Sequence, residues 1–536
     1  MAHSLQGVYS PLPQSLSDSD SEKEISMEPI CTNYVNSGLK HTKLEHSSGQ
    51  NGHLDFHSID DDVLKVKRVN PKMSTLRKAA FIFSILLCFF PIIIFLWILP
   101  CSNSNTCPVS ISNWEYQQDN IELRGKINLV HGAFQNSLNL AMMYKGSFNS
   151  QKMLKHGVIS FMGSNGAIAW DFQQGNCPID MNCSIIDVDG NGFNDCLVTD
   201  EKGLKVIETV SGEAVWHANS DQEKSIPKLD MPVKVDDFDN DGTNELLSIY
   251  KKKSFLLISG KTGRALSNIK LSRSCTYISN LTLVSSAIRY GCEIEQQPSK
   301  IFEISFSDLK NKYHNANEQL SPKEVTEATQ VIYETGNHKL TIENYGSCPH
   351  CQSTISLYGS NNTKLNVSIY ANAYVMAPLP YSFQSTEDNM VSLKGHIHGF
   401  ILKIWQWRNH FKKLPPTARI FKRSLPIYNK TYYLNEISEI VVLITFNETD
   451  RHIINASLTD RYQICMEPDD LNSCEPDHED ERDSLLIADM DHDNSLELIS
   501  YSSSYIKRPD EGSDNWHLVS FVKVLRLENE LRKLYE

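Results

Sequence analysis

Three short acidic segments with one shared pattern constrain this chain more than any other feature. They span residues 187–195, 237–245 and 489–497, and we call them the first, second and third acidic loops. Each has carboxylate or amide side chains at positions 1, 3 and 5 and a carboxylate at position 9. Oxygen donors at this spacing are typical of a loop that encloses a calcium ion. With the position 7 carbonyl included, the predicted ligands are Asp187, Asp189, Asn191, Phe193 and Asp195; Asp237, Asp239, Asp241, Thr243 and Glu245; and Asp489, Asp491, Asp493, Ser495 and Glu497.

The EF-hand is the competing interpretation, because it shares the opening of this pattern. An EF-hand also needs a bidentate Glu at position 12 and a helix on either side. Position 12 is here Val198, Ser248 or Ser500, and the flanking residues read as strands. Position 6 is Gly in the first two loops and Asn494 in the third, and both residue types tolerate a left-handed turn. The pattern therefore predicts loops between strands, closed by the acid at position 9.

The acidic loops belong to a longer repeat. The first two begin 50 residues apart, and each is followed by two strand-like runs and a turn that contains Gly. That closing turn recurs at 163–170, 210–216 and 260–266. The opening loop of the earliest copy has His131, Ala133 and Gln135 where the others have acids, so we expect no metal there.

The length of this repeat decides the predicted fold. One unit holds about 50–60 residues, which is enough for four short strands, and residues 119–536 hold roughly seven such units. Four-stranded units arranged radially form a β-propeller. We predict an all-β fold with about seven blades, and a series of two-sheet sandwiches is the alternative.

An apolar segment precedes the repeats. Residues 79–99 are 21 residues without a charge, and about 20 apolar residues are enough for a transmembrane helix. Basic residues lie just before this segment, whereas none follows it until Arg124. The positive-inside rule then places the N-terminus in the cytosol, as in a type II membrane protein. We expect a disordered cytosolic tail (1–78), a transmembrane signal-anchor helix (79–99), a juxtamembrane stalk (100–118) and an extracellular or lumenal propeller (119–536).

Sequons and cysteines agree with this topology. All seven Asn-X-Ser/Thr sequons and eleven of the 13 cysteines follow the apolar segment, as expected for an oxidising compartment. The predicted glycosylation sites are Asn182, Asn280, Asn361, Asn366, Asn429, Asn447 and Asn455. The predicted disulfides are Cys275–Cys292 and Cys465–Cys474, whereas Cys177, Cys183 and Cys196 compete for partners. Because the number is odd, Cys101 at the membrane edge is the candidate for a disulfide-linked dimer.

Cys348 and Cys351 have the spacing of a redox-active pair. Such a pair becomes reactive when it opens a helix, whose N-terminus lowers the pKa of the thiol. The residues that follow alternate like a strand, so we expect a small structural bridge and keep thiol–disulfide oxidoreductase activity as the alternative.

Two other pairs receive structural interpretations. His396 and His398 alternate on one predicted strand and lack an evident third ligand, so we expect no zinc site there. Trp405 and Trp407 are expected to pack between blades and not to stack on a sugar.

The three acidic loops resemble the FG-GAP repeat of integrin α N-terminal regions. Together with one membrane span and a Leu-Pro-Cys sequence beside it, they make the chain similar to the type II membrane proteins called "family with sequence similarity 234". The resemblance implies structural Ca²⁺ in a propeller that serves as a binding platform. It implies no agreed activity.

The expected function is binding and not catalysis. A net charge of −14 argues against a nucleic-acid partner. We expect a membrane glycoprotein that presents a calcium-stabilised platform to a protein or glycan, at the cell surface or in the secretory pathway. The alternative is a folding or trafficking factor, whose tail has a Tyr9 sorting motif and phosphorylation candidates Ser17, Ser19 and Ser21.

Overall fold

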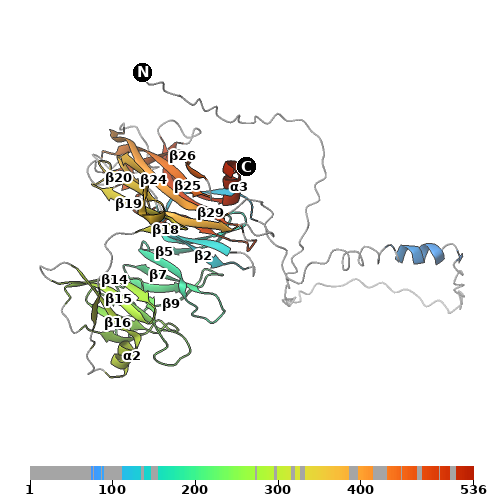
Figure 1. Ribbon diagram of the computed structural model, residues 1–536. Coiled ribbons are helices and arrows are strands. Elements are labelled where there is room, and N and C mark those ends of the chain that lie inside the picture. The colour runs from blue at the N-terminus through green and yellow to red at the C-terminus, as the bar shows by residue number, and fades with distance from the viewer. Residues whose placement is uncertain are drawn as a thin grey trace, which may run out of the picture. The chain divides into compact units, whose positions relative to one another are not determined.

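The computed structural model (Figure 1) describes residues 74–75, 78–85, 87, 89, 111–133, 138–146, 155–271, 275–294, 299–315, 320, 322–325, 332–384, 396–414, 431–447, 450–466, 474–493, 495–507 and 515–535. The chain divides into two compact units, Met1–Ile93 and Ile94–Glu536.

In the first unit the described residues from 75 to 89 are helical, and their side chains are exposed. They include the first part of the predicted transmembrane helix. In the parts of the chain that the structure describes, no helix is both long enough and apolar enough to cross a membrane. The rest of the predicted span, Tyr9, the three candidate serines, Cys101 and Asn429 lie outside the described residues.

The second unit is built from antiparallel sheets, and its described strands form seven of them. Sheets 1 to 4 hold β2 (Ile121–His131), β3 (Leu138–Gly146), β4 (His156–Met162) and β5 (Ile168–Gln174); β6 (Asp180–Ile186), β7 (Asp195–Asp200), β8 (Gly203–Ile207) and β9 (Ala214–His217); β10 (Val233–Lys234), β11 (Leu246–Tyr250), β12 (Ser254–Ile258) and β13 (Ala265–Ile269); and β14 (Tyr277–Val284), β15 (Ala287–Glu293), β16 (Lys300–Ser305) and β17 (Lys323–Val325).

The remaining three sheets follow the same order along the chain. Sheets 5 to 7 hold β18 (Tyr333–Thr335), β19 (His338–Tyr345), β20 (Gln352–Tyr358) and β21 (Lys364–Ala371); β22 (Ala373–Val375), β23 (Leu379–Gln384), β24 (His396–Lys413), β25 (Tyr433–Phe446), β26 (Arg451–Cys465) and β27 (Cys474–Glu475); and β28 (Leu485–Ala488), β29 (Glu497–Lys507), β30 (Trp516–Arg526) and β1 (Trp114–Asp119). In the described residues of this unit the helices are η1 (Ser360–Asn362), α2 (Phe306–His314) and α3 (Leu527–Tyr535). The predicted all-β propeller fold is confirmed.

Sheet 7 joins the two ends of this fold. Its first three strands come from the end of the chain, and β1 completes it by pairing with β30, from Trp114 opposite Val524 to Asp119 opposite Val519. The predicted stalk ended at residue 118, so β1 begins inside that range. The alternation of apolar and polar residues in β1 is short, so it is a weak strand signal. As an edge strand, β1 gains its stability from pairing with β30, about 400 residues away in the sequence.

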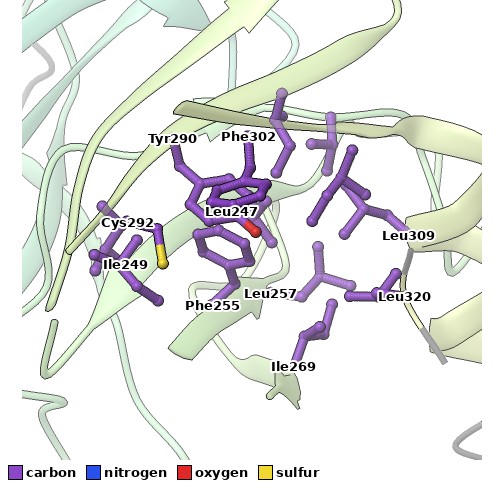
Figure 2. Packing of buried hydrophobic residues seen from close by; sticks show 14 of the residues in the cluster. Leu247, Ile249, Phe255, Leu257, Ile269, Tyr290, Cys292, Phe302, Leu309 and Leu320 are labelled. Atoms are coloured by element: carbon purple, nitrogen blue, oxygen red, sulfur yellow. The ribbon is translucent and has the colours of Figure 1, made fainter. Parts of the chain in front are cut away.

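Apolar side chains fill the spaces between neighbouring sheets. Figure 2 shows the largest such cluster, where Leu247 and Phe255 of sheet 3 face Tyr290 and Phe302 of sheet 4, and Leu309 of α2 closes one side. Phe255 and Tyr290 meet edge to face with ring centroids 5.1 Å apart. Strands such as β12 are buried along their whole length, because both faces of their sheet are covered.

A tryptophan in the last strand of one sheet is hydrogen-bonded to the next sheet at three successive junctions. Each indole N–H donates to a backbone carbonyl in the turn between the third and fourth strands of its neighbour. The three bonds run from Trp114 to Gly163 (2.8 Å), from Trp170 to Thr209 (2.8 Å) and from Trp216 to Gly260 (3.0 Å). These turns are the three copies of the closing turn in the sequence repeat.

A glycine in each of these turns makes room for the indole ring. Gly166, Gly212 and Gly263 have φ of +74°, +75° and +71°, which only glycine adopts readily. A Cβ atom on any of them would lie 2.4–2.6 Å from the neighbouring tryptophan ring. The glycine of each closing turn therefore serves a contact with the preceding sheet as well as the local turn.

Candidate metal loops

The three acidic loops occupy one structural position. Each connects the first and second strands of its sheet: β6 to β7, β10 to β11, and β28 to β29. In each loop the position 9 acid lies at the start of the second strand or just before it. Asp195 and Glu497 begin β7 and β29, and Glu245 immediately precedes β11. No helix flanks any of them, which excludes the EF-hand.

The first acidic loop curls around its own carboxylates. Asp187 accepts hydrogen bonds from the backbone N–H groups of Gly190 and Gly192, both at 2.8 Å. Asp189 accepts from the N–H of Asn191 at 3.0 Å. Gly190 and Gly192 have φ of +77° and +90°, so the turn that gathers the acids depends on glycine.

The second acidic loop repeats this geometry. Asp237 accepts from the N–H groups of Asn240 (2.6 Å) and Gly242 (3.0 Å), and Asp241 accepts from Thr243 (2.9 Å). One oxygen from each of four carboxylates, Asp237, Asp239, Asp241 and Glu245, lies within 4.8 Å of the others. The first loop gathers Asp187, Asp189 and Asp195 in the same way.

The position 9 acids are the strongest sign of a cation site. Asp195 and Glu245 are fully buried, and one oxygen of each accepts the N–H of position 2, from Val188 (2.8 Å) and from Phe238 (2.6 Å). The other oxygen, Oδ1 of Asp195 and Oε1 of Glu245, is buried without a hydrogen-bond partner. A buried, unpaired carboxylate oxygen is costly unless a cation or donor satisfies it.

Burial, and then the neighbouring acids, raise the pKa of Asp195 to about 6 and that of Glu245 to about 7. Burial is the largest cause in both residues, and the backbone N–H of position 2 partly offsets it. A donor set made of oxygens alone, with several carboxylates, fits Ca²⁺ better than a transition metal. The residues present therefore fit the predicted ion.

The third acidic loop differs, because an arginine already sits among its acids. Arg526, the last residue of β30, lies 3.2 Å from Asp491 and 3.5 Å from Glu497 and forms an ion pair with Asp493. The three aspartates Asp489, Asp491 and Asp493 come together, but Glu497 is not part of that group. The guanidinium supplies positive charge directly to the carboxylates of this loop.

Residues before β1 also reach this third loop. The N–H of Ile111 donates to Asp491 at 2.7 Å, and Asn113 accepts from the N–H of Arg526 at 2.8 Å. The sequence gives no signal for these contacts, because the partners are separated by 380 and 413 residues.

The counterpart of these loops in sheet 1 connects β2 to β3, as the repeat predicts. His131, where that loop begins, packs on Phe193 of the first acidic loop with ring centroids 4.1 Å apart. Residues 134–137, including Gln135, lie outside the described part of the chain.

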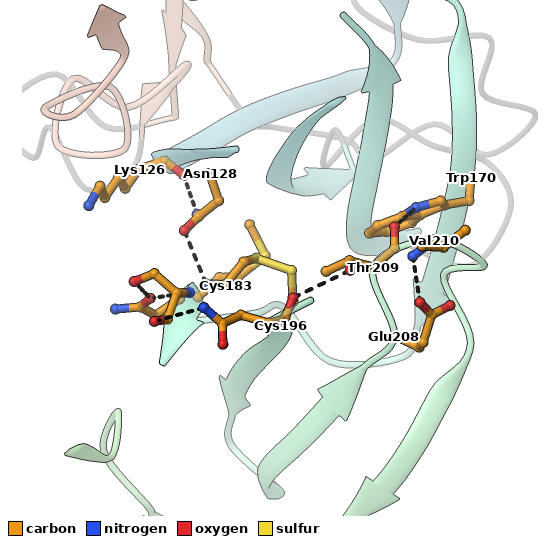
Figure 3. The surroundings of a disulfide bond; sticks show 12 residues. Lys126, Asn128, Trp170, Cys183, Cys196, Glu208, Thr209 and Val210 are labelled. Atoms are coloured by element: carbon orange, nitrogen blue, oxygen red, sulfur yellow. Dashed lines mark hydrogen bonds between the residues drawn. A yellow bond between two sulfur atoms is a disulfide. The ribbon is translucent and has the colours of Figure 1, made fainter. Parts of the chain in front are cut away.

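Four disulfides form in the described residues. Cys275–Cys292, Cys465–Cys474 and Cys348–Cys351 are paired as predicted. The fourth, Cys183–Cys196, joins β6 to β7 beside the first acidic loop, where Asn128 accepts the N–H of Cys183 (Figure 3). Cys177 remains a thiol, to which Arg124 donates at 3.0 Å.

The Cys348–Cys351 bridge lies in a hairpin. Strand β20 follows it directly, and no helix is present to lower a thiol pKa. Both cysteines are buried and pack with Trp405 and Trp407, whose side chains are also buried. Geometry therefore favours the structural interpretation for all four residues.

The described sequons are accessible to different degrees. Asn280 and Asn455 are exposed, and Asn182, Asn366 and Asn447 are half-buried. Asn361 lies in η1. Glycosylation at these positions stays a prediction.

A buried ionic network could not be predicted from the sequence. The segment 476–484 connects sheet 6 to sheet 7 and reads as an acidic surface loop, yet Glu481 is fully buried. Glu122 of sheet 1 is also fully buried and pairs with Lys145 at 3.2 Å, and Asp480 pairs with both Lys145 (3.0 Å) and Arg124 (2.8 Å). Only an unusual run of charges marks this segment in the sequence.

Comparisons with known proteins agree with the fold. Residues 152–354 match the family model described as the FAM234A/B beta-propeller, a range that includes the first and second acidic loops. Mouse FAM234A (Mus musculus) is 24% identical over 224 residues, which are 38% of this chain and 40% of that protein. Chicken FAM234B (Gallus gallus) is 29% identical over 119 residues, 20% of this chain and 18% of that protein.

These matches cover less than half the length of the relatives. Among solved structures, BBS1N in complex with ARL6DN is 11% identical and covers 77% of this chain and 96% of its own, with a TM-score of 0.31, a likeness that carries no argument about function. The family match and the named relatives show that this chain is similar to the FAM234 group, as the sequence resemblance predicts.

Proposed function

We propose that this protein is a non-enzymatic binding platform, in which Ca²⁺ bound by the first and second acidic loops rigidifies a β-propeller of seven blades. The single observation that carries the proposal is the pair of buried carboxylate oxygens, one each on Asp195 and Glu245, that lack a hydrogen-bond partner. In both loops a bound Ca²⁺ would satisfy that oxygen and offset the neighbouring charges.

The topology is part of the proposal. The apolar segment 79–99, the basic residues before it and the sequons after it support a single-pass type II glycoprotein with a cytosolic N-terminus. Loops on the propeller would then face the cell exterior or the lumen, where calcium is abundant enough to fill sites of moderate affinity. The ligand would be a protein or a glycan.

Binding is favoured over redox catalysis by the surroundings of the one candidate reactive pair. Cys348 and Cys351 are 9% and 5% exposed, which leaves a substrate disulfide little access to either sulfur. Their replacement by serine is expected to lower stability without removing a catalytic activity.

The experiment compares the thermal unfolding of the full chain, purified in detergent, with saturating Ca²⁺ and after chelation. Chelation should lower the unfolding temperature. The double variant Asp237→Ala/Asp241→Ala should lose part of that shift, whereas Asp236→Ala, an exposed neighbour outside the carboxylate group, should keep it. Superimposable curves with and without calcium would refute the proposal.

The platform role needs a second readout. Proximity labelling from the intact protein in cells should mark a defined set of neighbours, and the same double variant should lose the subset that depends on a rigid propeller. If the double variant labels the same neighbours as the wild type, partner binding does not depend on calcium binding. Insulin-reduction activity that is lost when Cys348 and Cys351 are replaced would instead favour the oxidoreductase.

A further inference from the structure

Three histidines gather where sheets 5 and 6 meet. Nδ1 of His338, the first residue of β19, lies 2.9 Å from Nε2 of His398 in β24. His396, two residues earlier on β24, has its ring centroid 5.2 Å from that of His398. The sequence offered only His396 and His398, and the fold supplies the third imidazole from 60 residues away.

The position of this cluster matches that of the acidic loops. His338 follows the turn between the first and second strands of sheet 5, and His396 begins the strand after the corresponding connection in sheet 6. Those two connections lack the acidic pattern. In sheets 5 and 6, imidazoles therefore lie near the connection between the first and second strands. In three other sheets that connection carries the acidic loops.

The site is shaped around the rings. Gly336 has φ of +54°, and a Cβ atom there would lie 2.7 Å from Nε2 of His398, so only glycine leaves space for that ring. Phe446 stacks on His338 with centroids 3.6 Å apart and fixes the plane of the imidazole. His398 is 9% exposed, and its Nδ1 is buried without a hydrogen-bond partner.

Burial affects the protonation of His338 and His398. Burial lowers the pKa of His398 to about 4, with His338 and His396 contributing. Burial also lowers the pKa of His338, and Arg451 adds to the effect. A lowered pKa favours the neutral imidazole, which is a ligand for Zn²⁺, Cu²⁺ and Ni²⁺ but a poor one for Ca²⁺.

We propose that His338, His396 and His398 form a binding site for a divalent transition-metal ion such as Zn²⁺ or Cu²⁺, separate from the calcium loops. Two nitrogens on one tetrahedral Zn²⁺, each about 2.0–2.1 Å from the ion, lie about 3.3 Å apart. The observed 2.9 Å between His338 and His398 needs a shift of only a few tenths of an ångström to accommodate it.

His396 completes the site by turning toward the ion. Its Nε2 now lies 3.0 Å from Oγ of Ser382, an exposed contact that is readily given up. As they stand, the three imidazoles do not bring one nitrogen each within 4.8 Å of the other two, so the rotation of His396 is required, and water would take the fourth position. The ion would then tie β19 of sheet 5 to β24 of sheet 6.

The competing interpretation is an imidazole–imidazole hydrogen bond. One ring would donate and the other accept across the 2.9 Å, whichever tautomers are present. The hydrogen bond and the metal would both use Nε2 of His398, so the unpaired Nδ1 of that ring does not distinguish them and the titration has to.

The test titrates the full chain in detergent with Zn²⁺ and with Cu²⁺, at saturating Ca²⁺ so that the acidic loops are filled. Calorimetry should show one Zn²⁺ site, which His338→Ala and His398→Ala each weaken by about tenfold or more. His314→Ala, at the end of α2 and far from the cluster in sequence, is the matched control and should bind as the wild type.

Electron paramagnetic resonance of the Cu²⁺ form covers the case in which a variant fails to fold, because it uses the wild-type protein. It should show coupling to imidazole nitrogens, with one fewer in His396→Gln. Absence of nitrogen coupling, or Zn²⁺ binding unchanged in the double variant His338→Ala/His398→Ala, would overturn the proposal. Neither outcome bears on the calcium loops, so the two proposals fail separately.

Discussion

Nζ of Lys403 lies 2.9 Å from Oε2 of Glu481, and both side chains are withdrawn from solvent, at 1% and 0% exposed. Lys403 belongs to β24, whereas Glu481 belongs to the connection that precedes β28. The same ammonium donates to Ser484 (2.9 Å) and to the carbonyl of Tyr501 (2.7 Å), so one lysine holds the connection and sheet 7 against sheet 6.

Replacing Lys403 by Met should destabilise the protein strongly. The substitution keeps the length of the side chain but leaves Glu481 buried without its counter-ion, which costs about 3–5 kcal/mol. Chemical denaturation of the full chain would measure the loss. Arg408→Met, which breaks the exposed pair with Asp460, should change stability by about 0.5 kcal/mol or less.

A double variant separates charge from packing in that prediction. Lys403→Met/Glu481→Gln removes both charges, so it should recover part of the stability lost in Lys403→Met alone. A double variant no more stable than the single one would mean that the ammonium acts mainly through its other partners, Ser484, Tyr501 and Glu439.

Gly263→Ala should weaken the contact between sheets 2 and 3. The new Cβ would lie 2.4 Å from the ring of Trp216, and alanine is also strained at a φ of +71°. We expect a loss of about 1–3 kcal/mol and a shift in tryptophan fluorescence. Gly175→Ala is the control, because a Cβ atom there would meet nothing within 4 Å and its φ is not in the left-handed region. Equal effects at the two positions would contradict a contact between sheets.

The calcium-free protein should lose stability as the pH rises. Burial, followed by neighbouring charges, raises the pKa of Glu245 and of Glu497 to about 7, above the ordinary 4.5. The folded state then binds these protons more tightly than the unfolded state, so the stabilisation is complete below pH 4.5 and is lost as the pH passes 7.

Unfolding temperatures of chelated protein between pH 5 and 8 would show this fall. Added Ca²⁺ should remove it at neutral pH, because the ion offsets the charge that deprotonation creates. Glu245→Gln should flatten part of the fall in the chelated protein and weaken the response to calcium. A pH profile that is the same with and without calcium would count against the cation sites.

Arg526→Ala should raise the calcium affinity of the third acidic loop. In the wild type an ion must compete with the guanidinium for Asp491 and Asp493, whereas the variant leaves those carboxylates without a counter-ion. Calorimetry should show two tight calcium sites in the wild type and a third in the variant. Lys523→Ala, which removes an exposed cation from the same strand, should leave the count at two. An unchanged count in Arg526→Ala would mean that the arginine and the ion do not compete.

The acidic loops were predictable because every ligand and the turn that gathers them lie within nine consecutive residues. Asp237 accepts the backbone N–H of Gly242, five residues away, so the loop geometry follows from the local sequence. The hairpin disulfides Cys275–Cys292 and Cys465–Cys474 were predictable for the same reason. Repeat spacing then indicated the propeller, since each unit has to bury its faces against a neighbour.

Contacts between distant segments were not predictable. Sequence alone determined the all-β repeats, the positions of the acidic loops and the local disulfides, because these follow from short-range geometry and periodicity. Tertiary structure decided that Arg526 enters the third loop, that His338 joins His398, and that Glu481 is buried beside Lys403. Their partners are brought together only when whole sheets pack, and a run of charges carries no mark of whether it will face water or another sheet.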